Sequence, residues 1–291
     1  MKKIINYYYN FFPETISKQY GGFSFEDKDK KYLLTELIIL PEQFLDIYEN
    51  LMLLNIKYFI ILYNKDNLTV TLYENKYYVL FIINCNQKQV LRFDEQFFIQ
   101  LDSEINWSKL WSERIDYYEI QINELAQEKK IILHNVYYYI GLTENAIIIA
   151  DKYEKQITKE SGVQHHRMNA PITKGDYFNP ANMIVDVSIR DIAEYIKSSF
   201  FIEKKDSIYY IDYIKSLYLT EITANLLIAR LLYPSYYFDI FDEIILENRD
   251  EEDLISIINL QKNYERLLKE MYILLSQDFK MLNINWLKIK L

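Results

Sequence analysis

Residues 174–201 read KGDYFNPANMIVDVSIRDIAEYIKSSFF and join a polar loop to two more regular segments. The loop contains Gly175 and Pro180, which are both typical of turns. It leads into the apolar run 183–185, and residues 190–201 then carry apolar side chains at helical spacing. The stretch therefore predicts a loop, a short apolar segment and an amphipathic helix in succession.

Three oxygen-bearing side chains of this stretch suit metal-assisted phosphoryl transfer: Asp176, Asn182 and Asp186. That chemistry needs a carboxylate to accept the hydroxyl proton, an Asn to bind Mg²⁺, and a further Asp to hold the metal against the phosphates. If the protein is active, we expect Asp176 to be the base, and Asn182 and Asp186 to bind Mg²⁺ with ATP. Because Asp, Asn, Gly and Pro are common in any turn-rich loop, the same residues also fit a surface loop without chemistry.

The composition favours a protein of one large domain or two lobes, because half of its 291 residues are apolar. Only five residues are Gly, which leaves few for a glycine-rich phosphate loop. The net charge is -9 and no dense Lys/Arg cluster stands out, so we expect no nucleic-acid partner. The single cysteine, Cys85, fits a reducing cytosol and excludes an internal disulfide framework. We expect a cytoplasmic protein, since no apolar run reaches the roughly 18 residues of a transmembrane helix.

The first 85 residues predict a small strand-rich lobe. Residues 17–40 read as two strands around a polar turn at Asp27–Lys30, and residues 41–55 as an amphipathic helix. Residues 57–85 read as three short strands. We therefore place an N-terminal strand-rich lobe at residues 1–85. Its first 14 residues lack a cleavage site and are interpreted as mature protein.

Residues 86–291 predict a larger and mostly helical C-terminal lobe. The apolar side chains recur there at spacings of three and four. The expected fold class is therefore α+β. The predicted helices span residues 104–129, 137–153, 190–201, 206–219, 220–233 and 257–274.

Two other kinds of site are not supported by the sequence. His165 and His166 are adjacent, and on an extended strand they point to opposite faces, so we expect no metal site there. The sequence contains no Gly-x-Ser-x-Gly elbow for a serine nucleophile. Cys85 ends an apolar strand and is interpreted as a small buried side chain.

Three segments, taken in their order along the chain, resemble a known superfamily. They are YYYIGLTENAI (137–147), RDIAEYIKSSFF (190–201) and LTEITANLLIARLLYPSYYFDIFDEII (219–245). With the two-lobe layout they resemble the kinase-like fold in its aminoglycoside-phosphotransferase form. More narrowly, the chain resembles the spore-coat-associated proteins of spore-forming Firmicutes in that superfamily. The resemblance implies a two-lobed protein-kinase-like fold.

The chain departs from active members of this superfamily in the residues that would handle phosphate. They carry a Lys on the third strand, whereas YLLTELIIL (32–40) has none and Lys30 and Lys31 are placed in the preceding turn. Their phosphate-covering loop is matched only by Gly21-Gly22. Their metal-binding Asp lies on a strand pair, and residues 183–189 are interpreted as too short for one.

The catalytic loop itself has two possible matches. Active members have His-Gly-Asp with an Asn five residues after the Asp. Here Asp176 follows Lys-Gly, and Asn182 comes six residues later. Alternatively, His166-Arg167-Met168 is the equivalent, and the base is then replaced by Met168.

The resemblance and its departures together imply a non-catalytic, pseudokinase-like protein that acts in sporulation and spore coat assembly through protein-protein interaction. We expect no cofactor and no metal, with ATP and Mg²⁺ only for the alternative, an active small-molecule phosphotransferase. His166, Arg167, Arg190 and Asp191 are then structural remnants of a catalytic region. Partners are expected in the spore coat, and the cytoplasmic protein is expected to associate with it. Exposed members of the 28 Tyr and 16 Phe side chains would form the contact surface.

Overall fold

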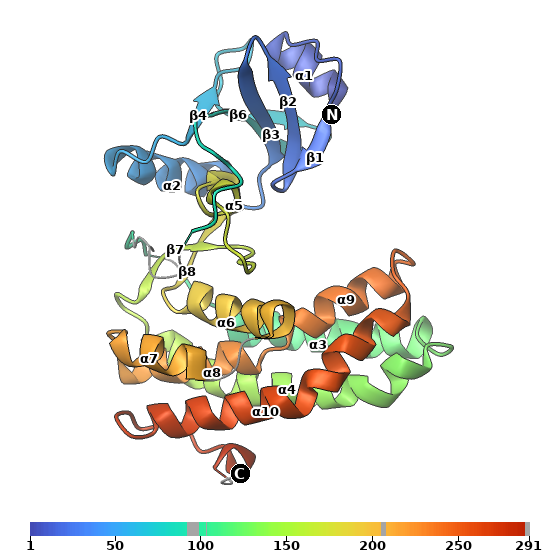
Figure 1. The fold of residues 1–291 in the computed structure, drawn as a ribbon, viewed down its shortest axis with the longest axis vertical. Helices are drawn as coiled ribbons and strands as arrows, with labels where there is room; N and C mark the ends of the chain where they lie inside the picture. Colours follow the sequence, from blue (N-terminus) through green and yellow to red (C-terminus); the bar gives the residue numbers. More distant parts are fainter. Residues whose placement is uncertain (92–98, 103, 205–207, 289–291) are drawn as a thin grey trace. The chain divides into compact units, whose positions relative to one another are not determined.

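The protein divides into two compact units, one built on a sheet and one mostly helical (Figure 1). The structure is a computed structural model that describes residues 1–91, 99–102, 104–204 and 208–288. Unit 1 comprises Met1–Leu101 and Gly162–Val185, and unit 2 comprises Asp102–Ser161 and Asp186–Leu291. The α+β fold class is confirmed. The lobe boundary at residue 85 stays a prediction, because compactness alone does not identify the part that folds by itself.

Unit 1 is organised around an antiparallel sheet with the order β1-β2-β3-β6-β4, and β5 also pairs with β6. Two helices belong to the same unit, α1 (Lys2–Tyr9) and α2 (Pro41–Leu53). The predicted strand pair around the turn at Asp27–Lys30, the helix and the three further strands are confirmed, but residues 17–40 hold three strands where two were predicted. The strands are β1 (Ser17–Gln19), β2 (Gly22–Asp27), β3 (Lys30–Glu36), β4 (Phe59–Leu62), β5 (Thr71–Tyr73) and β6 (Lys76–Ile83).

Both faces of the sheet are covered, because successive side chains of a strand point to opposite faces. On β3, Leu33 belongs to a core that includes Phe44 of α2. Leu34 belongs to a second core that includes Ile4 and Ile5 of α1. No helix was predicted for the first residues, and α1 forms there because its apolar side chains close the second face.

The start of β3 corrects one prediction. Lys28 and Asp29 have positive φ values of 46° and 63° and form a two-residue turn. Pairing resumes at once, with Asp27 opposite Lys30. Lys30 and Lys31 therefore belong to the strand, and their placement in the preceding turn is wrong.

A second, two-stranded sheet pairs β7 (Ser161–His165) with β8 (Met183–Val187). The chain between them forms the one-turn helix α5 (Lys174–Tyr177) and a 3-10 turn at Pro180–Asn182. As predicted, residues 183–189 are too short for a hairpin, and they hold the single strand β8. The partner strand lies before the loop rather than directly after β8, so no additional hairpin is needed.

Unit 2 is built from helices that bury apolar stripes against one another, as the periodicity predicts. Helix α4 begins seven residues earlier than predicted, where Glu251 accepts a hydrogen bond from the backbone N–H of Ile131 at 2.9 Å. None of the helices in the described ranges is long and apolar enough to cross a membrane. The helices are α3 (Trp107–Glu124), α4 (Lys130–Tyr153), α6 (Arg190–Glu203), α7 (Ile208–Ser216), α8 (Glu221–Leu232), α9 (Ser235–Ile245) and α10 (Ile255–Leu275).

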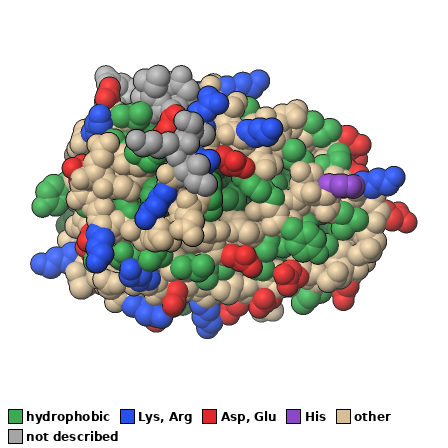
Figure 2. All heavy atoms as spheres, turned by 90° about the horizontal axis from the view of Figure 1, so that it is seen from below, with side chains coloured by type: hydrophobic (Ala, Val, Ile, Leu, Met, Phe, Trp, Pro, Cys, Tyr) green, Lys and Arg blue, Asp and Glu red, His purple; other side chains and the backbone are tan. Residues whose placement is uncertain are grey.

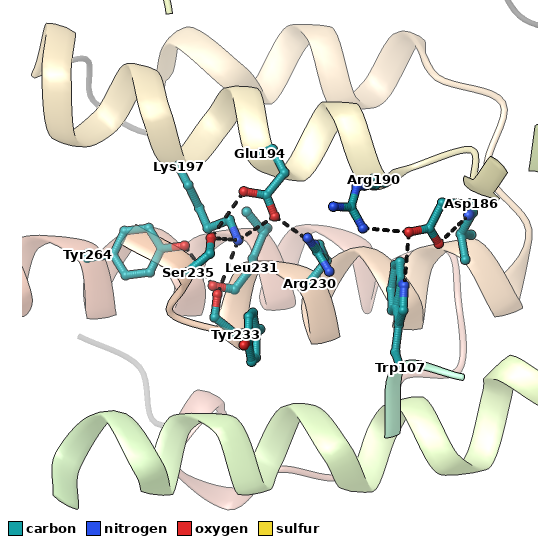
Figure 3. A network of polar contacts seen from close by, with 11 residues as sticks. Trp107, Asp186, Arg190, Glu194, Lys197, Arg230, Leu231, Tyr233, Ser235 and Tyr264 are labelled. Atoms are coloured by element: carbon teal, nitrogen blue, oxygen red, sulfur yellow. Dashed lines mark hydrogen bonds and ion pairs between the residues drawn. The ribbon is translucent and has the colours of Figure 1, made fainter. Parts of the chain in front are cut away.

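A buried charge network joins three of these helices (Figure 3). Lys197 of α6 is 1% exposed, and its ammonium donates to Glu194 at 2.7 Å, to Ser235 Oγ at 2.8 Å and to the Tyr233 carbonyl at 3.1 Å. Glu194 also accepts from Arg230 Nε of α8 at 2.6 Å. Burial opposes ionisation of Glu194, but the charges of Lys197 and Arg230 outweigh it and lower its pKa. The carboxylate therefore stays charged and ties α6 to α8 and to the start of α9.

Stability should rise with pH where Lys197 titrates. Burial is the largest influence and lowers the pKa of Lys197 to about 8, although the charge of Glu194 acts the other way. Between this value and the ordinary 10.5, the unfolded chain binds more protons than the folded one, so unfolding becomes more costly as pH rises. We expect the difference in unfolding free energy between wild type and Lys197→Met to grow between pH 8 and 10, measured by urea denaturation.

Lys155→Met is the matched control. A hydrogen bond from exposed Lys155 to Asp151 raises the pKa of that lysine. Its contribution is therefore fully present below the ordinary pKa of 10.5, so the difference from wild type should stay flat between pH 8 and 10. A Lys197→Met difference that stays flat or falls over the same pH range would contradict the assignment.

Candidate functional site

A cavity of about 320 Å³ lies within unit 1, beside the loop between β7 and β8. The turn between β1 and β2 and the end of β3 form other parts of its wall. Several of the residues singled out from the sequence line this cavity together: His165, His166, Arg167, Asp176 and Asn182.

Asp176 and Asn182 both take part in local hydrogen bonds of the loop. Asp176 accepts from Thr173 Oγ1 at 2.7 Å, while its own backbone N–H donates to that hydroxyl at 3.2 Å. This reciprocal pair caps the first turn of α5. The side-chain amide of Asn182 donates to the Arg167 carbonyl at 3.0 Å. Both side chains therefore hold the loop in shape.

His165 is a buried residue that anchors the far end of α5. Its ring is 2% exposed, lies within 2.6 Å of the Tyr177 carbonyl through Nε2, and stacks on the Tyr177 ring with centroids 4.7 Å apart. The backbone N–H of His166 donates to the Asn182 carbonyl at 2.7 Å. Within the described part of the chain, no cluster of three or more His, Cys, Asp or Glu side chains could hold a metal ion.

The two glycines of the first hairpin have conformational and packing roles. Gly21 has φ +70° in the tight turn between β1 and β2. A Cβ on Gly22 would lie 2.4 Å from Thr35 Oγ1 and 2.5 Å from the Leu34 carbonyl. The pair thus permits a sharp turn and a close approach of β2 to β3.

Asp186 makes its contacts within unit 2 (Figure 3). One carboxylate oxygen accepts from Arg190 at 2.5 Å and from the indole N–H of Trp107 at 3.2 Å. The other accepts from the backbone N–H of Val187 at 2.7 Å. Asp186 is 5% exposed, so this carboxylate is a buried and fully engaged ion-pair partner.

Arg190 and Asp191 open helix α6 and are both buried. Burial and the nearby charge of Arg230 lower the pKa of Arg190, and Asp186 opposes that shift. The structural roles predicted for His166, Arg167, Arg190 and Asp191 stay predictions. The sequence analysis missed Glu194, Lys197 and Arg230. Two signals could have identified them: Glu194 and Lys197 are opposite charges three residues apart on a predicted helix, and Arg230 follows the apolar residues 226–229.

The two aspartates should differ sharply in what they contribute to stability. Asp186→Ala leaves Arg190 buried without its carboxylate, so we expect a loss of about 3–5 kcal/mol. Asp176→Ala removes an exposed carboxylate that binds the Thr173 cap but keeps the cap itself, so it should cost at most about 1 kcal/mol. Urea denaturation of both variants beside wild type measures the difference. Equal losses of unfolding free energy in the two variants would show that the buried ion pair stabilises the protein no more than the exposed hydrogen bond of Asp176 does.

The fold is similar to that of solved phosphotransferases. An aminoglycoside phosphotransferase from Alicyclobacillus acidocaldarius superposes with a TM-score of 0.59 at 9% identity, covering 91% of this chain and 93% of that one. Spectinomycin phosphotransferase APH(9)-Ia, solved with ADP and spectinomycin, gives a TM-score of 0.55 at 11% identity, covering 93% and 97%. At such identities the likeness concerns the fold alone, and it confirms the predicted kinase-like architecture.

Similarity in sequence identifies the family more narrowly than similarity in fold does. The chain is 28% identical over 207 residues to the endospore coat-associated protein YutH of Bacillus subtilis (strain 168). That match covers 62% of this chain and 61% of the relative, which is less than two thirds of its length. The profile of the family described as "Spore coat putative kinase YutH" matches residues 2–271. The chain therefore belongs to the YutH family of spore coat kinase-like proteins.

Proposed function

We propose that this protein is a non-catalytic member of its kinase-like family that acts in spore coat assembly by binding other proteins. The observation that carries the proposal is the engagement of Asp186. Its two carboxylate oxygens accept from Arg190, Trp107 and the Val187 backbone, so both oxygens already have donors. A carboxylate used in this way supports the packing of unit 2 and not a metal ion.

Mg²⁺ and ATP fit the residues present poorly. A divalent cation at Asp186 would lie beside the guanidinium of Arg190, and a double and a single positive charge about 4 Å apart repel by about 8 kcal/mol at an effective dielectric constant of about 20. The cavity in unit 1 has Glu36 and Asp176 in its wall, and among its described lining residues Arg167 supplies the one permanent positive charge and none is a lysine. Transfer of a phosphoryl group relies on positive charge to neutralise the phosphates. The balance of charge supports a protein without turnover.

The position after His166-Arg167 also supports the proposal. Met168 lines the cavity and is 5% exposed. A thioether cannot accept a hydroxyl proton, so this loop has no general base if Met168 occupies the position of the catalytic Asp. Asp176 is the remaining candidate base, and it is engaged with Thr173.

The surface offers apolar and aromatic side chains for protein contacts. Tyr218 is 99% exposed, Phe12 71% and Tyr7 65%. On the face in Figure 2, acidic and basic side chains are interspersed with hydrophobic ones. Exposed aromatic rings are enriched where proteins bind one another. The relative in Bacillus subtilis is endospore coat-associated, which supports partners in the coat for this chain as well.

The alternative is an active small-molecule phosphotransferase, and one observation favours it. Asp176 and Asn182, the candidate base and the candidate metal ligand, line the same cavity. Nucleotide binding distinguishes the two functions.

Thermal melting with and without ATP and Mg²⁺ tests directly whether the protein binds the nucleotide and metal that catalysis would need. A ligand at 100 times its dissociation constant adds about 2.7 kcal/mol to the stability of the folded state. We expect no Mg²⁺-dependent shift in Tm at millimolar nucleotide. A shift of several degrees that Asn182→Ala abolishes would contradict the proposal, and Asn182→Ala is preferred to Asp186→Ala because it leaves the buried ion pair intact.

Complementation in a spore-forming host tests the role in the coat. We expect Asp176→Asn to restore coat assembly in a strain that lacks the gene, because the isosteric amide removes the candidate base and keeps an acceptor for Thr173. A fluorescent fusion of the same variant should surround the spore as the wild-type fusion does. Failure of Asp176→Asn to restore the coat, with normal protein levels, would favour the active enzyme. A wild-type fusion spread through the cytoplasm would contradict the coat assignment.

A further inference from the structure

A short segment of the loop between β7 and β8 is bound to the chain that follows β6. We call residues 172–176 the strap. It is held against residues 87–91 by three backbone hydrogen bonds and includes an isolated antiparallel bridge between Val90 and Thr173 outside both sheets. The backbone bonds are Leu91 N–H to the Ile172 carbonyl at 2.8 Å, Lys174 N–H to the Gln89 carbonyl at 2.7 Å and Gly175 N–H to the Gln87 carbonyl at 3.0 Å.

The strap depends on a glycine for its close contact. A Cβ on Gly175 would lie 2.9 Å from the Gln87 Cβ and 2.9 Å from the Tyr20 ring. Distances under 3.0 Å are not tolerated by carbon atoms, so a side chain at this position forces the strap away from its seat. A substitution at this one position can therefore displace the strap.

Two cavities lie next to the strap. The cavity of about 320 Å³ is lined by Ile172 and Asp176 of the strap, and a second cavity of about 500 Å³ is lined by Cys85 and Gln87. Tyr20 lines both and is their shared wall, and Gly175 packs on its ring. Each volume lies in or near the range of about 300–1,000 Å³ that is usual for ligand pockets.

Each cavity also has a buried polar atom without a hydrogen-bond partner among the described residues. In the first it is Thr35 Oγ1, on a residue that is 3% exposed, and in the second it is Gln87 Nε2, on a residue that is 8% exposed. Buried polar groups in native proteins are nearly always paired, and leaving one unpaired is costly. Both atoms thus have hydrogen-bonding capacity that no described residue uses and that a ligand can satisfy.

We propose that the strap is a latch over one binding cleft, and that an extended peptide segment of a partner protein replaces it. The closed strap is itself a peptide held by one N–H and two C=O groups of residues 87–91, so these groups can bind the backbone of another peptide. When the strap lifts, the shared wall at Tyr20 loses its support and the two cavities join. The backbone groups of residues 87–91 and the side chains of Thr35 and Gln87 then face the incoming segment.

The ends of the strap allow this motion without unfolding the sheet. Beyond it, Tyr177 is held by His165, and the Asn179 side-chain amide donates to the Tyr20 carbonyl at 3.1 Å. The only helix that the strap enters is α5, which has four residues, so lifting the strap disrupts about one helical turn. The choice of a partner peptide rests on the proposed function, whereas the latch does not.

Release of the strap can be measured with the single cysteine. Cys85 is partly buried and lines the second cavity, so its reaction with a thiol reagent reports on the joined cleft without background from other cysteines. We expect Gly175→Val to speed this labelling by about tenfold or more, which corresponds to a tenfold shift in the opening equilibrium. Gly141→Ala is the matched control, because a Cβ there meets nothing within 4 Å, and it should label like wild type.

A second variant guards against misfolding of the first. Lys174→Pro removes the N–H that binds the Gln89 carbonyl, and proline is well suited to the first helical position that Lys174 occupies in α5. Lys174→Ala keeps that N–H and serves as its control. Lys174→Pro should label faster than Lys174→Ala, and equal rates in both pairs of variants would overturn the latch.

The strap's own sequence provides the probe for the incoming segment. A fluorescent peptide NAPITKGDYF, copied from residues 169–178, should bind Gly175→Val at least about tenfold more tightly than wild type by anisotropy, since it meets no competing strap. The same peptide with Val in place of Gly should not bind. Faster Cys85 labelling without peptide binding would overturn the peptide ligand. Nucleotide binding by the wild type would contradict the proposed function but leave these outcomes unchanged.

Discussion

The ion pairs around Glu194 are the interaction on which the helical unit depends. Glu194 accepts from Lys197 and from Arg230, and the remaining donors of Lys197 reach Ser235 and the carbonyl of Tyr233. A buried charge is tolerated only when its partners and hydrogen bonds are in place. The network therefore requires one relative placement of α6, α8 and α9, whereas apolar packing alone would accept small shifts.

A buried ion pair also determines whether the Asp186 carboxylate, near the end of β8, is available to bind a metal ion. Arg190, one turn before Glu194 on α6, is paired with Asp186, and Trp107 of α3 donates to the same carboxylate (Figure 3). A carboxylate that neutralises a buried guanidinium would weaken that ion pair if it also bound a metal ion. The kinase-like architecture is thus combined with a carboxylate used for packing, and this combination supports a protein that works through its surfaces.

In unit 1 the constraint is steric, because two backbone segments approach their neighbours too closely for a side chain to fit. The sheet has a core on each face, and the hairpin between β1 and β2 approaches β3 closely because Gly22 has no side chain. Gly175 allows the strap to approach Tyr20 and Gln87 in the same way. In a protein with few glycines, two of them make backbone contacts that shape the cavities, and neither contact requires a bound phosphate.

The sequence by itself determined the α+β class and most of the helices and strands, because apolar periodicity and turn residues act locally along the chain. The order of three segments along the chain was enough for the resemblance to the kinase-like family. It also placed Asp176 and Asn182 in one loop, and the tertiary structure keeps them in one cavity. Only the tertiary structure decided that Lys31 lies in a strand, that β8 pairs with a strand before the loop, and that Asp186 is bound to Arg190. These outcomes depend on which groups meet across long separations in sequence, such as the 79 residues between Trp107 and Asp186, and no local pattern encodes that meeting.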